Sequence, residues 1–171
     1  DGKILVGGDY RGTNGDEKAG VRRLNADGSI DSSFSVEQMA GDISSGAIVY
    51  DLELQCDGKI IVAGEYRFSS GVGPRNVARL NTNGTVDTTF STAINGTTIK
   101  GVVIQPDGKI IAAGFFTNLN IPTTFRSTTT GSLDAAFDSI QTGSGRIEAV
   151  ELQPDGEIIV GGVYTTLNGF P

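Results

Sequence analysis

The pattern of apolar and polar residues repeats along the chain about every fifty residues. Four times an Asp-Gly pair is followed by a charged residue and an apolar run that ends in glycine, at residues 1–8, 57–64, 107–114 and 155–162. The aspartates that open these segments are 56, 50 and 48 residues apart. A period of this size is typical of propellers, solenoids and repeat arrays.

The second copy predicts four short antiparallel strands. They are expected at residues 59–66, 77–81, 85–90 and 99–105. Asp57-Gly58 and Asn83-Gly84 separate apolar runs, and such pairs are strong hairpin signals. Residues 60–63 are apolar at successive positions rather than alternating, so both faces of the sheet must be covered. Sheets stacked face to face satisfy this requirement, as the blades of a β-propeller do.

We therefore expect an all-β chain, with residues 1–171 forming a partial β-propeller whose blades each have four antiparallel strands. The repeats are expected at residues 1–56, 57–106 and 107–154, with a partial repeat at 155–171. Closed propellers need roughly four to eight blades. An open arc would leave strand edges uncovered, so these three and a third repeats are expected to belong to a larger propeller or to be closed by other chains.

The third copy departs from the other two in one strand. Ser127 stands where Leu24 and Leu80 stand in the first and second copies. Because a buried leucine is replaced by a small polar residue, the sequence predicts a weaker or shifted strand there.

Three motifs keep their order and spacing from copy to copy and carry a resemblance. They are Gln-Pro-Asp-Gly-Lys-Ile-Ile at 105–111, Ala-Arg-Leu-Asn at 78–81, and a hydrophobic residue followed by Asp-x-x-Phe at 86–90. Over essentially its whole length the chain resembles the delta-60 repeat family of β-propeller-like domains. The resemblance implies a propeller in large bacterial exported or surface proteins and in some phage tail or fibre proteins. It implies no catalytic residues.

Two charged positions recur in every full copy. They are occupied by Arg23, Arg79 and Arg126, and by Asp31, Asp87 and Asp134. We interpret them as architecture: the aspartate accepts backbone amide hydrogen bonds in a turn and pairs with the arginine, which fixes the register of the strands. The alternative is a ring of arginines that lines a channel and binds an anion.

Two further recurring positions admit a binding role. Asn25, Asp27, Ser29 and Asp31 place oxygens at alternate positions, as calcium loops do, but hairpin turns explain the same residues and no EF-hand glutamate follows. No metal and no cofactor are therefore predicted. The aromatic residues after the glycine pairs could stack on a sugar, although packing between blades is favoured. They are Tyr10, Tyr66, Phe116 and Tyr164.

The loops that differ between copies are the better candidates for specificity. Residues 67–76 hold an aromatic ring and two guanidinium groups, so Arg67, Phe68 and Arg75 are predicted ligand contacts. Residues 35–46 are an insertion found only in the first copy and form a second candidate surface. The alternative for both is a plain solvated loop.

Composition excludes several classes of function. The chain has no histidine, so it cannot contain a Ser-His-Asp or Cys-His arrangement, and no zinc motif is present. Its net charge of −7 disfavours nucleic acid, which needs clustered Lys and Arg. No stretch approaches the roughly 20 apolar residues of a membrane helix, so no membrane insertion is expected.

These observations predict a non-catalytic scaffold or recognition module rather than an enzyme. Its expected place is extracellular, at a cell surface or on a virion, in an adhesin-like protein or a phage tail fibre. Its expected partners are a protein or glycan surface, bound through the variable loops, or neighbouring blades and chains of the same assembly. Two alternatives stay open: a purely structural spacer, and part of a carboxylate-based polysaccharide-degrading enzyme.

Overall fold

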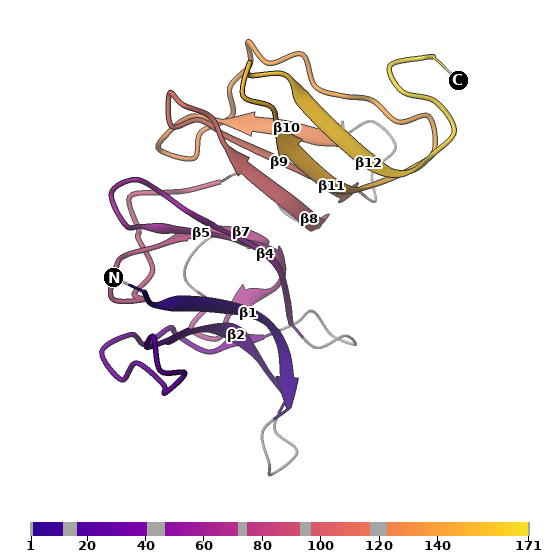
Figure 1. Ribbon diagram of the computed structural model, residues 1–171. Helices are drawn as coiled ribbons and strands as arrows, with labels where there is room; N and C mark the ends of the chain where they lie inside the picture. The colour runs from indigo at the N-terminus through magenta and orange to yellow at the C-terminus, as the bar shows by residue number, and fades with distance from the viewer. Residues whose placement is uncertain are drawn as a thin grey trace.

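The computed structural model describes residues 2–11, 17–40, 47–71, 75–92, 97–116 and 123–170. Over these ranges the chain forms twelve strands, arranged in four antiparallel sheets, and no helix (Figure 1). We call the sheets blades 1 to 4 in chain order. Within the described residues, helices long and apolar enough to cross a membrane are absent.

Each blade is built from consecutive strands, except that β6, which lies between β5 and β7 in the chain, joins blade 1. Blade 1 has the order β1 (Ile4–Arg11), β2 (Glu17–Leu24), β3 (Met39–Ala40) and β6 (Arg67–Phe68). Blade 2 consists of β4 (Ile48–Leu54), β5 (Ile60–Glu65) and β7 (Val77–Leu80). Blade 3 consists of β8 (Thr97–Ile104), β9 (Ile110–Phe116) and β10 (Thr124–Ser127). Blade 4 has β11 (Gly145–Leu152) and β12 (Ile158–Tyr164).

Each Asp-Gly turn sets the register of the hairpin whose two strands it connects. In blade 2, Gly58 takes a φ of 82°, a conformation that suits glycine. Its amide donates to the Gln55 carbonyl at 2.9 Å, and the Asp57 carboxylate accepts the Lys59 amide at 3.0 Å. Strands β4 and β5 therefore leave the turn paired from Leu54 and Ile60 onward, and the later copies repeat this arrangement.

A β-bulge lies near the far end of each of these hairpins, opposite a glycine. In blade 2 it falls between Val49 and Asp51, where Gly64 pairs with Val49. A Cβ atom on Gly64 would lie 2.1 Å from the carbonyl oxygen of Ile48. The glycine that ends the apolar run therefore permits a close approach between the two strands of one hairpin.

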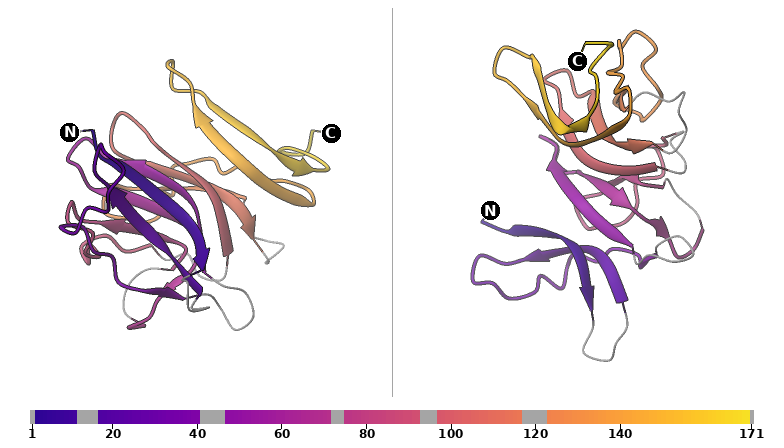
Figure 2. Two further views of the ribbon diagram at one scale, coloured as in Figure 1. Left: turned by 60° about the horizontal axis from the view of Figure 1, so that its bottom comes forward. Right: turned by 90° about the vertical axis from the view of Figure 1, so that its right-hand side faces the viewer.

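The blades lie face to face in chain order, so that the two ends of the chain are at opposite ends of the stack (Figures 1 and 2). Ile60 and Val62 of β5 pack in the core shared with blade 1, whereas Ile61 and Ala63 pack in the core shared with blade 3. A third cluster, which includes Val103 and Ile147, joins blades 3 and 4. Both faces of β5 are thus buried, which explains its run of apolar residues without alternation.

The prediction of four full strands in each copy is only partly met. The segment expected as a strand at residues 85–90 makes only one isolated bridge, between Leu80 and Val86, and the equivalent segments of the first and third copies make one bridge each, at Ile30 and Leu133. The strand stops because Asp87 begins a turn: its carbonyl accepts the Phe90 amide at 3.1 Å and its side chain accepts the Thr89 amide at 3.0 Å.

The prediction of a weaker or shifted strand in the third copy is wrong. Strand β10 has the same four-residue length as β7 and the same register, since Thr124 pairs with Ala113 as Val77 pairs with Ala63. Where the second copy has a small residue and then leucine, the third has Phe125 and then Ser127. Phe125 is 4% exposed and packs in the core between blades 2 and 3. The phenylalanine therefore supplies the apolar volume that the serine gives up.

Candidate functional site

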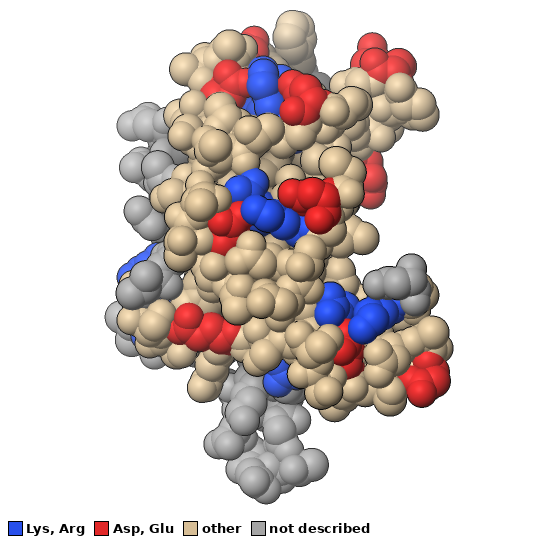
Figure 3. All heavy atoms as spheres, turned by 90° about the vertical axis from the view of Figure 1, so that its left-hand side faces the viewer, with Lys and Arg blue, Asp and Glu red and all other residues tan. Residues whose placement is uncertain are grey.

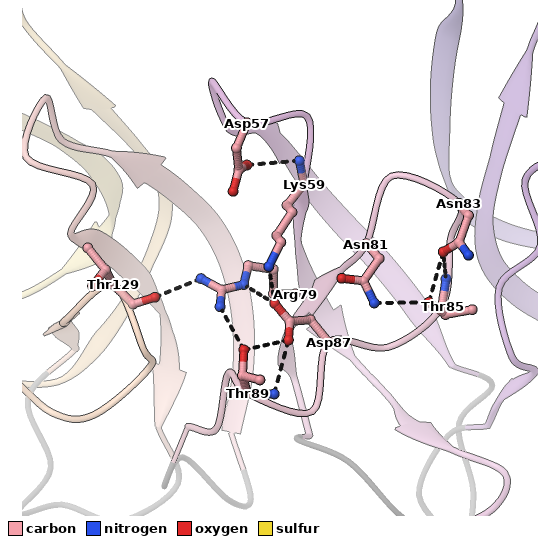
Figure 4. A network of polar contacts seen from close by, with 9 residues as sticks. All are labelled: Asp57, Lys59, Arg79, Asn81, Asn83, Thr85, Asp87, Thr89 and Thr129. Atoms are coloured by element: carbon pink, nitrogen blue, oxygen red, sulfur yellow. Dashed lines mark hydrogen bonds and ion pairs between the residues drawn. The ribbon is translucent and has the colours of Figure 1, made fainter.

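The buried carboxylate of Asp87 accepts several hydrogen bonds in the polar network of blade 2 (Figure 4). One oxygen of Asp87 accepts hydrogen bonds from Arg79 Nε and Lys59 Nζ, both at 2.8 Å. The other accepts the amide and the hydroxyl of Thr89, at 3.0 and 2.6 Å. Asp87 is only 5% exposed, and a buried charge of this kind must be paired to be tolerated. We call this set of residues, and its counterparts, the Arg–Asp node.

The same node recurs in the neighbouring blades. Asp31 accepts Arg23 Nε at 2.7 Å and Lys3 Nζ at 2.5 Å in blade 1. Asp134 accepts Arg126 Nε at 2.9 Å and Lys109 Nζ at 3.1 Å in blade 3. In each node the guanidinium carbon also lies 4.6–4.8 Å from the ring centroid of the phenylalanine three residues after the aspartate. The recurring Asp-x-x-Phe motif therefore holds the arginine by both a charge and an aromatic face.

The nodes hold their aspartates ionised. Hydrogen bonds from Lys3, Ser33 and Arg23 set the pKa of Asp31 far below its ordinary value. For Asp87, burial opposes ionisation, but the hydrogen bonds of Lys59, Thr89 and Arg79 outweigh it, and the pKa is again far below the ordinary value. The pKa of Asp134 is lowered chiefly by Lys109.

The arginines of blades 1 and 2 also reach the next blade. Arg23 Nη1 donates to the Thr82 carbonyl at 2.6 Å, and Arg79 Nη1 donates to the Thr129 carbonyl at 2.7 Å. These groups are engaged in the blades and their junctions, which disfavours an anion-binding ring. On the face shown in Figure 3, basic and acidic side chains lie beside one another in several separate groups, and they form no continuous basic patch.

The Asx-Gly turns use their side-chain oxygens internally. The carboxylate of Asp27 accepts the amide and hydroxyl of Ser29 at 2.9 and 2.7 Å, and the side chain of Asn83 bonds to Thr85 in the same way. These contacts are those of a hairpin turn rather than of a calcium loop. Over the described part of the chain, no three His, Cys, Asp or Glu residues are grouped as a metal site would require.

The two copy-specific loops lie against each other, which sequence reasoning missed. Strand β3, from the first-copy insertion, pairs with β6, from the loop of the second copy, through Met39 with Phe68 and Ala40 with Arg67. The Ser69 amide donates to the Gln38 carbonyl at 2.9 Å, and the Ser70 amide donates to the Glu37 carboxylate at 2.7 Å. We call this pair of loops, residues 37–40 and 67–71, the loop clamp. Residues 41–46 and 72–74 lie outside the described residues.

The three predicted ligand contacts, Arg67, Phe68 and Arg75, differ in their exposure. Phe68 is 2% exposed and packs edge-on against Tyr66, with ring centroids 5.8 Å apart. Its predicted role as a ligand contact is therefore wrong for this arrangement, because the ring is part of the core. Arg67 and Arg75 are exposed at the surface. The Tyr66 hydroxyl donates to the Val62 carbonyl at 2.9 Å, so this recurring aromatic packs inside the protein, whereas Tyr164 is exposed.

The bulges on the first strands of blades 2 and 3 bring together another group of polar residues. Asp51 accepts the Val102 amide of the next blade at 2.8 Å and its own neighbour's amide, that of Leu52, at 2.8 Å. Lys100 Nζ lies 3.4 Å from the ring centroid of Tyr50. Burial, followed by the negative charges of Asp51 and Glu151, raises the pKa of Glu53. No sequence motif marks these positions, because a bulge depends on pairing with the partner strand.

Comparison with known proteins agrees with this architecture. The family described as "Domain of unknown function (DUF5122) beta-propeller" matches residues 1–34, 55–90, 105–137 and 153–171. A search of curated proteins finds no significant match. The first three matched segments end at Phe34, Phe90 and Phe137, so each spans an Asp-Gly turn and a complete Arg–Asp node. With well over half of its residues matched, the chain belongs to this β-propeller family of unknown function.

Proposed function

We propose that this chain is a non-catalytic scaffold and recognition module of a large exported or virion-surface protein. The observation that carries the proposal is the loop clamp, which joins the two segments that differ most between copies. The recurring charged residues hold the blades together, so the copy-specific residues are left for specificity. The resemblance to delta-60 repeats supports the same role, and the family membership supports the propeller architecture on which it rests.

The clamp suits recognition because its backbone is held before a partner arrives. The pairing of β3 with β6, the Ser69–Gln38 backbone hydrogen bond and the Ser70–Glu37 contact fix the loops, and the buried Met39 and Phe68 anchor them to the core. Ordering a loop at the moment of binding weakens affinity, so a fixed loop binds more tightly. Exposed Arg67 beside polar Ser69 and Ser70 can meet the hydroxyls of a glycan or the carboxylates of a protein.

Binding to a glycan array and to surface proteins of candidate host cells tests the proposal. Arg67→Ala and Arg75→Ala are expected to weaken saturable binding at least tenfold without lowering Tm. The matched control is Arg146→Ala, because Arg146 is also exposed but lies in blade 4, beside Glu148. Binding that is insensitive to both loop variants would contradict a role for the clamp.

The two alternatives predict different results. A purely structural spacer shows no saturable binding to either set of probes. A carboxylate-based polysaccharide-degrading enzyme shows turnover that a single Asp or Glu substitution abolishes. Of the carboxylates near Glu53, Asp51 accepts backbone amides with both oxygens, which favours a structural role for it over catalysis.

A further inference from the structure

At the junctions of blade 1 with blade 2 and of blade 2 with blade 3, a turn of the later blade inserts into the blade before it. The turn of blade 2, residues 81–84, offers the Thr82 carbonyl to Arg23 and the Asn83 carbonyl to the Ser35 amide, at 2.6 and 3.0 Å. The turn of blade 3, residues 128–131, offers the Thr129 carbonyl to Arg79 and the Thr130 carbonyl to the Ser91 amide, at 2.7 and 3.1 Å. We call the node arginine and the amide that follows the node phenylalanine the turn socket of a blade.

The sockets select a turn with glycine at its fourth position. A Cβ atom on Gly84 would lie 2.7 Å from the carbonyl oxygen of Ser35, and one on Gly131 would lie 2.6 Å from that of Ser91. Gly28, at the same position in blade 1, would meet nothing within 4 Å among the described residues. The close contact at this glycine therefore arises when the turn inserts into the preceding blade and is not a property of the turn itself.

Blade 3 has a turn socket with no turn in it among the described residues. Arg126 is held by Asp134 and Phe137 as the other arginines are. Its Nη1 atom, however, bonds within its own blade, to the Gln105 side chain at 3.4 Å. Asp138 follows the node phenylalanine, in the place of Ser35 and Ser91, and lines a surface hollow of about 590 Å³ together with Ser139, Gln141, Asn168 and Gly169.

The strand edge beside this socket is open as well. Strands β5 and β9 each pair with a third strand, β7 and β10, whereas within the described residues β12 pairs with β11 alone. Ile159 and Val163 of β12 are 52% and 63% exposed. An uncovered apolar strand edge is a template for pairing with another segment.

We propose that the blade 3 socket and the free edge of β12 bind a β-hairpin with the chemistry of residues 77–90. Its first strand pairs with β12 as β7 pairs with β5, and the carbonyls of its Asx-Gly turn accept Arg126 Nη1 and the Asp138 amide. The two occupied junctions in the same molecule define this occupant. Blade 1 of a second copy is not expected to supply this hairpin. Its β2 is already paired with β1, which is the strand that corresponds to β12 of blade 4.

The test fuses a copy of residues 75–92 after Pro171 of the full chain. This gives a connection from β12 longer than the seven residues between β9 and β10 and shorter than the eleven between β5 and β7. Hydrogen exchange measured by NMR is expected to show amide protection in β12 and at Asp138 at least about tenfold higher in the fusion than in the unfused chain. A fusion with the same composition in scrambled order is the matched control.

Arg126→Lys, made in both proteins, separates docking from general stability. Lysine keeps the charge but loses the bond to the turn carbonyl, so the variant is expected to reduce protection at Asp138 in the fusion and not in the unfused chain. Equal effects in the two proteins, or equal exchange of β12 with and without the hairpin, would overturn the proposal. Concentration-dependent dimerisation of the unfused chain that protects β12 would also overturn it, by showing a second copy as the occupant.

Discussion

Arg79 donates a hydrogen bond of 2.7 Å to the backbone carbonyl of Thr129, a residue of the next blade. The same guanidinium is fixed in its own blade by Asp87, at 2.8 Å from Nε, and by the ring of Phe90. Pairing within one blade thus aims a donor at the following one, and Arg23 repeats the relationship with Thr82. A single recurring arginine therefore couples strand register within a blade to the succession of blades.

Replacing Arg79 with methionine is expected to lower the free energy of unfolding by about 3 kcal/mol, because it leaves the buried Asp87 short of a partner and the Thr129 carbonyl without its donor. Urea denaturation followed by circular dichroism measures the change. Arg146→Met is the control, since its pair with Glu148 is exposed and such pairs contribute roughly 0–1 kcal/mol. Equal effects of the two variants would show that the node contributes nothing beyond a surface pair.

Gly84→Ala and Gly28→Ala separate the cost of the turn conformation from that of insertion. Both glycines have positive φ, 92° and 84°, so both variants pay about 1–2 kcal/mol of backbone strain. Only Gly84 is inserted against Ser35, so its variant is expected to be less stable than Gly28→Ala by a further 1–3 kcal/mol. Thermal and urea unfolding of the pair give the difference, and equal losses would mean that the inserted turn yields freely.

Ser127→Ala is expected to stabilise the protein by about 1 kcal/mol. The Ser127 side chain is 1% exposed, and its hydroxyl has no hydrogen-bond partner among the described residues. An unsatisfied buried hydroxyl carries a desolvation penalty of roughly that size or more. Ser132→Ala, on the exposed turn of the same blade, is the control and should change stability little. A loss of stability in Ser127→Ala would show that the hydroxyl is bonded after all.

Acid should destabilise the protein through the Arg–Asp nodes. The pKa values of Asp31, Asp87 and Asp134 are lower in the folded state than their ordinary value, so the unfolded chain binds more protons as the pH falls below about 4. The stabilisation is complete above that pH and is lost progressively as the pH falls toward the folded-state values. Tm measured from pH 7 to pH 2 should drop steeply in this window, and Asp87→Asn should make the drop shallower. An unchanged slope in that variant would contradict the assignment.

Glu53 is expected to affect stability with the opposite pH dependence. Its pKa is raised by burial and by the charges of Asp51 and Glu151, so its ionisation opposes folding. The folded state is favoured below the ordinary pKa, and this advantage is lost as the pH rises through the raised value. Glu53→Gln is therefore expected to raise Tm at pH 7 and to leave it unchanged at pH 3. Glu148→Gln, an exposed glutamate on β11 of blade 4, is the control. A lower Tm for Glu53→Gln at pH 7 would refute the prediction.

Local sequence determined the repeat, the turns and the nodes. Asp57 and Gly58 specify their hairpin through contacts within a few residues, and the Arg79 and Asp87 positions could be paired because a motif at fixed spacing recurs in each copy. The strand expected at residues 85–90 was overestimated because Val86 continues the apolar alternation while Asp87 begins a competing turn. Turn chemistry and strand periodicity act over the same few residues there, and only the folded hairpin shows which prevails.

Tertiary structure decided what depends on distant partners. Phe68 reads as an exposed loop aromatic, yet pairing of β6 with β3 carries it into the core. Ser127 reads as a defect until Phe125 is seen to fill the space beside it. Short-range periodicity and turn preferences are written into each stretch of about ten residues, whereas loop pairing, volume compensation and turn insertion arise between segments that meet only when neighbouring blades stack.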